Sequence, residues 1–349
     1  MLAAEPAKPA LSGEGELFEG LLSTSARSAL ARSGFVSFAR SSGADIEGYV
    51  QHFSGLWADV GDGFVPDPKE VLRQMDQRES MLYDLWQLAL RDDFVKDTPP
   101  LVAQAPVTRT ANPVILRSAF LKRPLIVMSE GLWSFVCAAA MGVLHWAEGT
   151  GEREAFGVQL FRNAAASWVA NDPRIGPSGM DMARGATLDM ETGVFGAGLA
   201  DAVFTWAFLH EIGHYALGHL PVTQRLLGTA PDGQGTAATL TYDQQNELAA
   251  DAFGFERYLG LMPYSAEIRK NLRFGPQIDH APIVVFELMD LAYRLEGAES
   301  LLISQTHPAP LTRARRLLEL GSGRFSGEGL DWHAYWAERL AAFRREVGA

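Results

Sequence analysis

Two histidines four residues apart, with a glutamate directly after the first, form the pattern in this chain that most clearly indicates chemistry. They are His210 and His214, and the glutamate is Glu211. On a helix, residues i and i+4 lie on the same face, so the two imidazoles reach one metal ion without distorting the backbone. The spacing therefore predicts a metal site, with Glu211 beside it as a general base for hydrolysis.

The residues around this pattern are almost all apolar, so the helix is expected to be buried on nearly every side. A buried helix does not carry three ionisable groups unless they are paired or bound to something. The alternative is a chance histidine spacing with a satisfied core glutamate, which would arise on the order of once in a hundred chains of this length. The apolar neighbours are Phe204, Trp206, Phe208, Leu209, Ile212, Tyr215 and Leu217.

A catalytic zinc site of this type uses three protein ligands and leaves a fourth position open. The third ligand is predicted to be Glu247, on a second helix that also carries Asp251 four residues later. Small residues around the pair, at 249, 250, 252 and 254, let this helix approach the first one closely. Asp251 is expected to accept the outer N–H of one zinc-bound histidine. The alternative for Asp251 is a surface ion pair with Arg257.

Together these runs resemble the gluzincin metallopeptidases, the clan that contains thermolysin. Residues 246–254 are similar to the third-ligand helix of that clan, and residues 210–219 resemble the minimal gluzincin group of the HtpX heat-shock protease and the CAAX prenyl protease. In that group a Thr-His-Pro motif follows, with an arginine six residues after its histidine. Residues 306–308 read Thr-His-Pro here, and Arg313 stands at that offset. Lit-like phage-exclusion peptidases and IrrE-like peptidases share the His-Glu-x-x-His helix and are possible closer relatives.

The resemblance implies an α+β, mostly helical fold with a small edge β-sheet. Residues 125–128 are similar to the edge strand of the group, along which an extended substrate pairs through backbone groups. The resemblance also implies that His307 stabilises the oxyanion. Three further residues are expected to hold the metal ligands in place without binding the metal themselves: Asn246, Asp251 and Arg313.

Three segments are expected along the chain. Residues 1–15 are rich in Ala, Pro, Gly and Glu and are predicted to be disordered. Residues 16–100 form an N-terminal helical region, and residues 101–349 form the zinc metallopeptidase domain. Within that domain, β-like runs at 114–116 and 125–128 favour a hairpin.

Most of the remaining domain shows helical periodicity. A Gly-, Asp- and Met-rich stretch at 171–198 is predicted to be a loop, and 228–241 is a second loop that could cover the site. His219 is expected to lie at the end of the histidine helix and to cap it. The predicted helices run from 131 past 145, and over 199–220, 242–259, 282–295, 312–320 and 332–345.

Composition excludes several classes of protein. The net charge of −12 disfavours nucleic acid as a partner. Cys137 is the only cysteine, so neither an internal disulfide nor a cysteine-rich zinc site is possible, which fits the cytoplasm. No secretory signal is recognisable, and Asp201 interrupts the apolar stretch 194–209, so no integral membrane segment is expected. The oligomeric state is not indicated.

The predicted function is that of a zinc-dependent endopeptidase acting on a protein or peptide substrate. The alternative is a zinc-bound binding or regulatory module that recognises a protein partner without turnover. Glu211 favours the enzyme, because a zinc scaffold needs the ligands but not the base. A zinc hydrolase acting on a non-peptide bond is a third reading.

Overall fold

The computed structural model describes residues 35–37, 101–105, 114–116, 125–170, 179–219, 244–261, 276–299, 307–325 and 327–348. Most of these residues are helical, which confirms the prediction of a mostly helical chain. The predictions for residues 1–15, for most of 16–100, for the loop 228–241 and for Thr306 lie outside the described residues.

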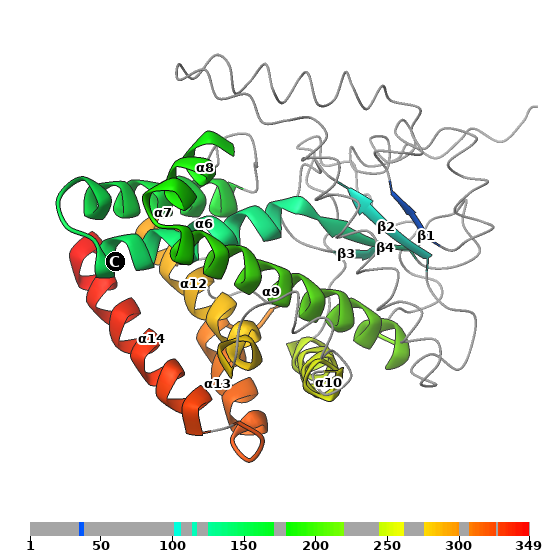
Figure 1. Ribbon diagram of the computed structural model, residues 1–349. Helices are drawn as coiled ribbons and strands as arrows, with labels where there is room; N and C mark the ends of the chain where they lie inside the picture. The colour runs from blue at the N-terminus through cyan, green and yellow to red at the C-terminus, as the bar shows by residue number, and fades with distance from the viewer. Residues whose placement is uncertain are drawn as a thin grey trace, which may run out of the picture.

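One helix, α9 (Met190–Ala216), runs through the middle of the described structure and carries the histidine pattern near its end (Figure 1). It packs against α6, α8, α10 and α12, and its last turns contact strands β3 and β4. The other helical elements are α6 (Glu130–Glu148), α7 (Glu152–Ala170), α8 (Gly179–Leu188), α10 (Gln244–Leu261), η2 (Pro276–His280), α12 (Ala281–Leu295), α13 (Pro310–Gly321) and α14 (Gly327–Val347).

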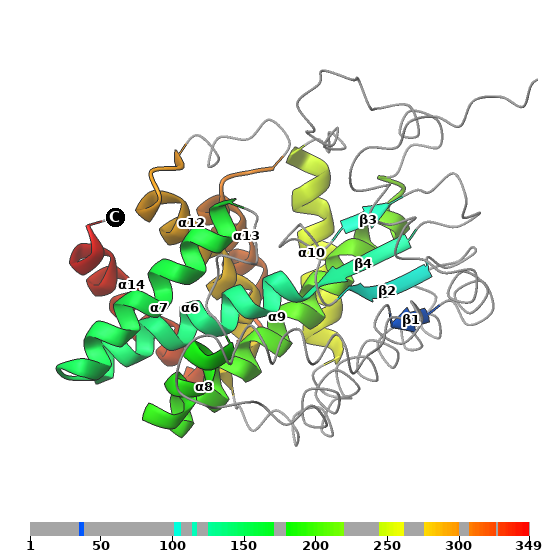
Figure 2. The same cartoon turned by 90° about the horizontal axis from the view of Figure 1, so that it is seen from above.

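A four-stranded sheet lies at the end of the molecule where α9 ends (Figures 1 and 2). Its strands are β1 (Phe35–Ser37), β2 (Leu101–Ala105), β3 (Val114–Leu116) and β4 (Leu125–Ser129). The order is β1-β2-β4-β3, with β4 parallel to β2 and antiparallel to β3. Strand β1 comes from the region that was expected to be helical.

The prediction that residues 125–128 form an edge strand is wrong. Strand β4 has a hydrogen-bonded neighbour on each side, and the outermost strand next to it is β3. This position is set by the pairing of β4 with β2 as well as with β3. Ile126 and Met128, which lie on one face of β4, are fully buried.

The prediction of a loop over residues 171–198 is also wrong from residue 179 onward, because α8 and the first turns of α9 occupy residues 179–188 and 190–198; residues 171–178 lie outside the described residues. The glycines that suggested a loop are sites of close helix packing. A β-carbon on Gly193 would lie 2.7 Å from Ala186 Cβ, and one on Gly196 would lie 2.6 Å from Met141 Cγ. Glycine in these helix positions costs backbone entropy, and the tight approach of α8 and α6 to α9 offsets that cost.

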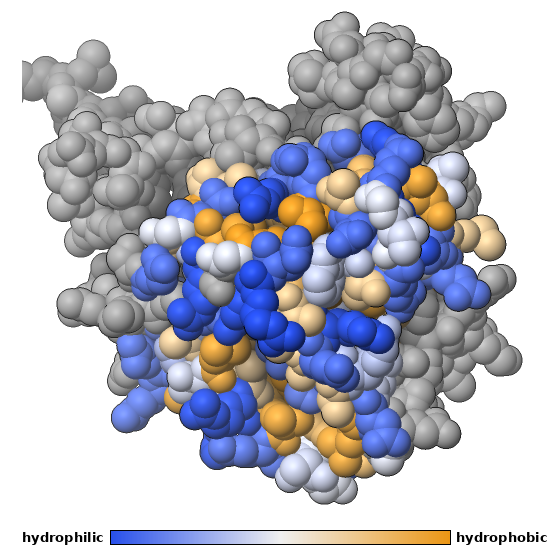
Figure 3. Space-filling model, turned by 90° about the vertical axis from the view of Figure 1, so that its left-hand side faces the viewer, coloured by the Kyte–Doolittle hydropathy of each residue, from blue (hydrophilic) through white to orange (hydrophobic). Residues whose placement is uncertain are grey.

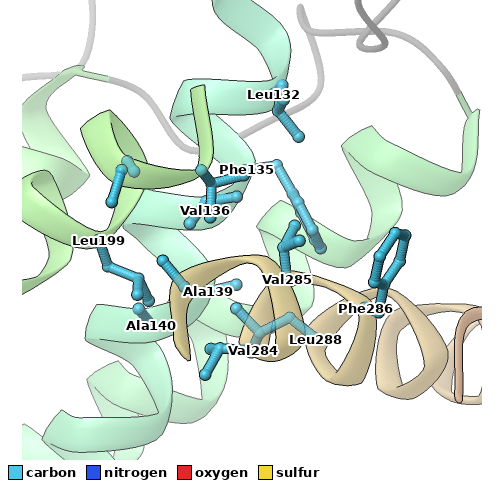
Figure 4. Packing of buried hydrophobic residues seen from close by; sticks show 14 of the residues in the cluster. Leu132, Phe135, Val136, Ala139, Ala140, Leu199, Val284, Val285, Phe286 and Leu288 are labelled. Carbon is cyan, nitrogen blue, oxygen red and sulfur yellow. The ribbon is translucent and has the colours of Figure 1, made fainter. Parts of the chain in front are cut away.

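The core lies between α6, α9 and α12, whose buried side chains point toward one another (Figure 4). Leu132, Phe135 and Val136 come from α6, and Phe286 and Leu288 come from α12. On the face shown in Figure 3, apolar residues lie in separate groups among hydrophilic ones. This packing holds α9 rigidly, so the residues of its last turns have fixed directions.

Among the described residues, α9 is the one helix long and apolar enough to cross a membrane. Of its most apolar window, 78% is buried inside the protein. A core helix passes the same length and composition test, so this feature alone is weak support for a membrane segment.

Candidate metal centre

The histidine pattern lies on the last turns of α9. Asp189 begins this helix by accepting the backbone N–H of Glu191, which satisfies one of the unpaired N–H groups at a helix start. From there the helix is continuous to Ala216, so His210 and His214 stand one turn apart on the same face, as predicted. Both histidines are buried.

Helix α10 approaches α9 so closely that backbone meets backbone. A β-carbon on Gly254 would lie 2.9 Å from the backbone nitrogen of His210, and one on Gly213 would lie 3.2 Å from the carbonyl oxygen of Ala250. The small residues of α10 therefore permit the approach that the sequence predicts. As a result, Glu247 and Asp251 of α10 are buried beside the two histidines.

Three side chains from these two helices converge on one point. The Nε2 atoms of His210 and His214 are 3.1 Å apart. Glu247 Oε1 lies 3.3 Å from His214 Nε2, and Glu247 Oε2 lies 3.7 Å from His210 Nε2. His210, His214 and Glu247 could hold a metal ion, since their ligand atoms all lie within 4.8 Å of one another.

These separations fit one tetrahedral ion. Two ligands at zinc distances of roughly 2.0–2.1 Å that subtend a tetrahedral angle stand roughly 3.3–3.4 Å apart. The three observed separations, 3.1, 3.3 and 3.7 Å, fall around that value. The donor set of two imidazoles and one carboxylate leaves a fourth position for water or substrate, as catalytic sites of this kind require.

The outer side of His210 faces a buried carboxylate. Its Nδ1 lies 2.9 Å from Asp251 Oδ1, at the distance though not the angle of a good hydrogen bond. An ionised carboxylate here favours a proton on Nδ1, so Nε2 keeps a lone pair that could bind a metal ion. Asp251 was predicted to accept the outer N–H of one of the two histidines, and the histidine that it faces is His210.

Arg313 of α13 holds the two carboxylates in place. It donates from Nε and Nη2 to the two oxygens of Asp251, at 2.7 and 2.6 Å, and its Nη2 lies 3.3 Å from Glu247 Oε2. The guanidinium also stacks over the ring of Phe286, 4.4 Å from its centroid. The alternative partner for Asp251, Arg257, instead lies over the ring of Phe253.

The carboxylates of this cluster and Arg313 favour one another's charged forms. Burial opposes ionisation of Glu247, but the neighbouring His214 and the charge of Arg313 outweigh it and hold the pKa of Glu247 below its usual range. Burial likewise opposes ionisation of Asp251, but its paired Arg313 lowers the pKa of Asp251. Despite its own burial, Arg313 has a raised pKa because Asp251 and Glu247 surround it. Two carboxylates therefore stay ionised at the centre.

Glu211 is buried between the candidate metal ligands and the end of the sheet. Its carboxylate accepts the backbone N–H of Ile115 in β3. Burial raises the pKa of Glu211 to about 7, against the opposing charge of His210. The same helix thus presents two ligands and a carboxyl group that can take up or release a proton near neutral pH.

His307 comes from the segment before α13 and reaches the same cluster, although 93 residues separate it from His214. Its Nε2 lies 3.6 Å from Glu247 Oε1, and its side chain is 43% exposed. Burial lowers the pKa of His307, which the charge of Glu247 opposes. An imidazole at the open side of the cluster is placed to touch a bound molecule.

Asn246 and His219 complete the predicted set and its surroundings. Asn246 lies in the first turn of α10 and is partly buried, and its supporting role stays a prediction. His219 follows the helix end, where its backbone N–H donates to the carbonyl of His214, as expected of a cap. Its ring was not expected at the site, yet His219 Nδ1 lies 3.1 Å from His214 Nδ1. The pKa of His219 is lowered to about 4 by burial and by the neighbouring His214 ring.

Comparisons with known proteins return nothing for this chain: no family model, no curated protein and no solved structure matches it.

Proposed function

We propose that this protein is a zinc-dependent endopeptidase of the gluzincin type, with His210, His214 and Glu247 as zinc ligands and Glu211 as general base. The observation that carries the proposal is the convergence of three buried ligand atoms at tetrahedral spacing, with a buried carboxyl group directly beside them on the same helix.

Zinc fits this donor set. Imidazole nitrogen and carboxylate oxygen suit zinc, whereas magnesium and calcium take oxygen ligands only. A closed structural zinc site would need a fourth protein ligand. The three described ligands therefore fit a catalytic site with one open position.

Zinc bound there would polarise a substrate carbonyl and lower the pKa of a bound water from 15.7 towards about 7. Glu211 takes a proton from the attacking water and passes it to the leaving amine. Burial, which raises the pKa of Glu211, favours its holding the proton between these two steps. His307, partly exposed at the open side, donates a hydrogen bond to the oxygen that becomes negative.

The substrate is proposed to lie extended beside β3 rather than beside β4, since β3 is the outermost strand next to the cluster. The backbone N–H of Ile115 points toward Glu211 and thus away from β4. Because Glu211 already accepts this N–H, a peptide on that side would pair with the remaining outer backbone groups of β3 and bring one carbonyl to the cluster.

Cleavage of a broad peptide library by the purified protein tests this function. Wild-type protein should cleave with zinc and lose cleavage when zinc is removed by a chelator. The Glu211→Gln variant should keep zinc and its unfolding temperature and lose about 10²–10⁴-fold in rate. Undiminished cleavage by Glu211→Gln would reject the mechanism. Zinc binding by the wild type with no cleavage of any peptide would favour the binding-module alternative.

A further inference from the structure

We infer that His219 is a positioning residue of the metal centre: its Nδ1 accepts the Nδ1–H of His214 and so fixes the ring whose Nε2 faces the other two ligands. The inference rests on the proposed metal centre and concerns how one of its ligands is held. It assigns a role to a residue whose expected task was helix capping.

The contact between the two rings has the geometry of a hydrogen bond. The Nδ1 atoms of His214 and His219 are 3.1 Å apart, and the ring planes meet at 67°. A hydrogen bond between two imidazole nitrogens needs an N–H on one ring and a lone pair on the other. One of the two rings must therefore donate.

The other ring nitrogen of His214 decides which ring donates. His214 Nε2 faces Glu247 Oε1 at 3.3 Å and His210 Nε2 at 3.1 Å, the directions of the shared metal position. A nitrogen that binds metal offers a lone pair, so the single proton of the neutral ring is on Nδ1. His214 is then the donor and His219 the acceptor, which fixes both tautomers.

The backbone after α9 is built so that this contact forms. Leu217 N–H donates to the carbonyl of Gly213, and His219 N–H donates back to the carbonyl of His214, at 2.9 Å each. Between them Gly218 has a φ of +71°, a left-handed conformation that residues with a β-carbon rarely adopt. This turn folds the chain back over the last helical turn and brings the His219 ring onto His214.

The two histidine ligands are consequently held by different chemistry. His210 faces the Asp251 carboxylate, which is fully buried and shared with Arg313. His214 faces an imidazole, which accepts a hydrogen bond without adding a negative charge to the cluster. Since outer partners set ring orientation and ligand basicity, removing the acceptor should weaken metal binding. His219 is only partly buried, so a substitution there is compatible with folding.

Two variants of His219 with similarly branched side chains separate the effect of the hydrogen bond from the effect of packing. In His219→Asn, the side-chain amide oxygen can take the place of Nδ1 as acceptor. The leucine of His219→Leu has nearly the volume of histidine but no acceptor. The dissociation constant for Zn²⁺ is measured for the full chain by competition with a chromophoric chelator. His333→Ala, which removes a histidine outside the metal cluster, serves as control, and unfolding temperatures in excess EDTA report the metal-free fold.

His219→Leu should bind Zn²⁺ about 10–100-fold more weakly than the wild type, and His219→Asn should stay within about threefold of it. The inference is overturned if His219→Leu binds as tightly as the wild type, or if both variants lose affinity equally. A wild type that binds no Zn²⁺ would overturn the inference and the proposed function together. If His219→Leu binds Zn²⁺ weakly while the wild type binds zinc but cleaves no peptide, the inference is upheld and the proposed peptidase function is rejected.

Discussion

Two groups of histidine, aspartate and arginine lie at opposite ends of α9, and they use the same side-chain types differently. At the start of the helix, Arg153 Nε donates to Nδ1 of the buried His145, and Arg153 also pairs with Asp189. At the end of the helix, Asp251 faces the outer nitrogen of His210 and is paired with Arg313.

In the first group the side chains of Arg153, Asp189 and Thr192 bind one another, and Arg153 also binds His145. Asp189 accepts from Glu191 N–H and from the hydroxyl of Thr192 as well as from Arg153, and the Nδ1 lone pair of His145 is used by Arg153. Nothing converges on an outside ligand, so this group fastens α6, α7 and the start of α9 together. Its chemistry is that of a helix cap with an attached ion pair.

In the second group Asp251 and Arg313 bind each other, and Asp251 also faces the outer nitrogen of His210, Nδ1. The inner nitrogen of His210, Nε2, therefore points away from them. Two inner nitrogens and the Glu247 carboxylate then face one position. Lone pairs and negative charge facing one another at these distances favour a cation between them. What distinguishes a metal site from a structural network is thus the direction of the lone pairs rather than the types of residue.

The largest expected contrast between the two ends is in turnover. His307→Ala should lower the rate of peptide cleavage by about 10²–10³-fold while zinc stays bound, because its hydrogen bond strengthens only as the oxyanion forms. His145→Ala should lower the unfolding temperature and leave the rate per folded molecule unchanged. Steady-state rates and zinc content of both proteins give the comparison. Loss of zinc from His307→Ala would mean that His307 is a ligand.

Matched changes of the two aspartates should separate metal affinity from stability. Asp251→Asn removes the carboxylate behind His210 and should weaken zinc binding by about 10–100-fold. Asp189→Asn keeps a good helix cap and loses a partly exposed ion pair worth at most about 1 kcal/mol, with no effect on zinc affinity. Chelator competition and thermal unfolding measure the two quantities. Equal zinc affinities in the two variants would remove the distinction between the groups.

Much of the site could be predicted from the sequence, because helical periodicity alone puts His210 above His214 and Glu247 above Asp251. The predicted helix bounds after residue 240 are close to those observed for α10, α12 and α13, and α14 begins five residues earlier than expected. The apolar run past residue 131 is divided into α6 and α7 at Gly151, where φ is +60°.

Other features depend on partners that are distant in the sequence. The glycines before residue 199 suggested a loop, and only the neighbouring helices show why they lie in helices. The place of β4 within the sheet depends on β2 and β1, whose pairing no local pattern reveals. The ring contact of His219 depends on the reversal at Gly218, although a histidine directly after a glycine at the helix end is a signal that could have suggested it.

A smaller effect should follow from a substitution that pushes α10 away from α9. Gly254→Ala places a methyl group against the backbone of His210, so α10 must shift and the free energy of unfolding should fall by about 1–3 kcal/mol, with weaker zinc binding. Gly260→Ala on the same helix has open space and should raise that free energy by up to about 1 kcal/mol. Denaturant unfolding of both proteins tests this. Identical stabilities would show that the contact at Gly254 relaxes freely.

The zinc content of purified protein, measured by elemental analysis, tests the central claim most directly. The wild type and Asp189→Asn should each hold about one zinc per chain, and Glu247→Ala, which removes the third ligand, should lose it. Full zinc occupancy in Glu247→Ala, or a wild type that holds no zinc even after exposure to excess zinc, would contradict the assignment of His210, His214 and Glu247 as one metal centre.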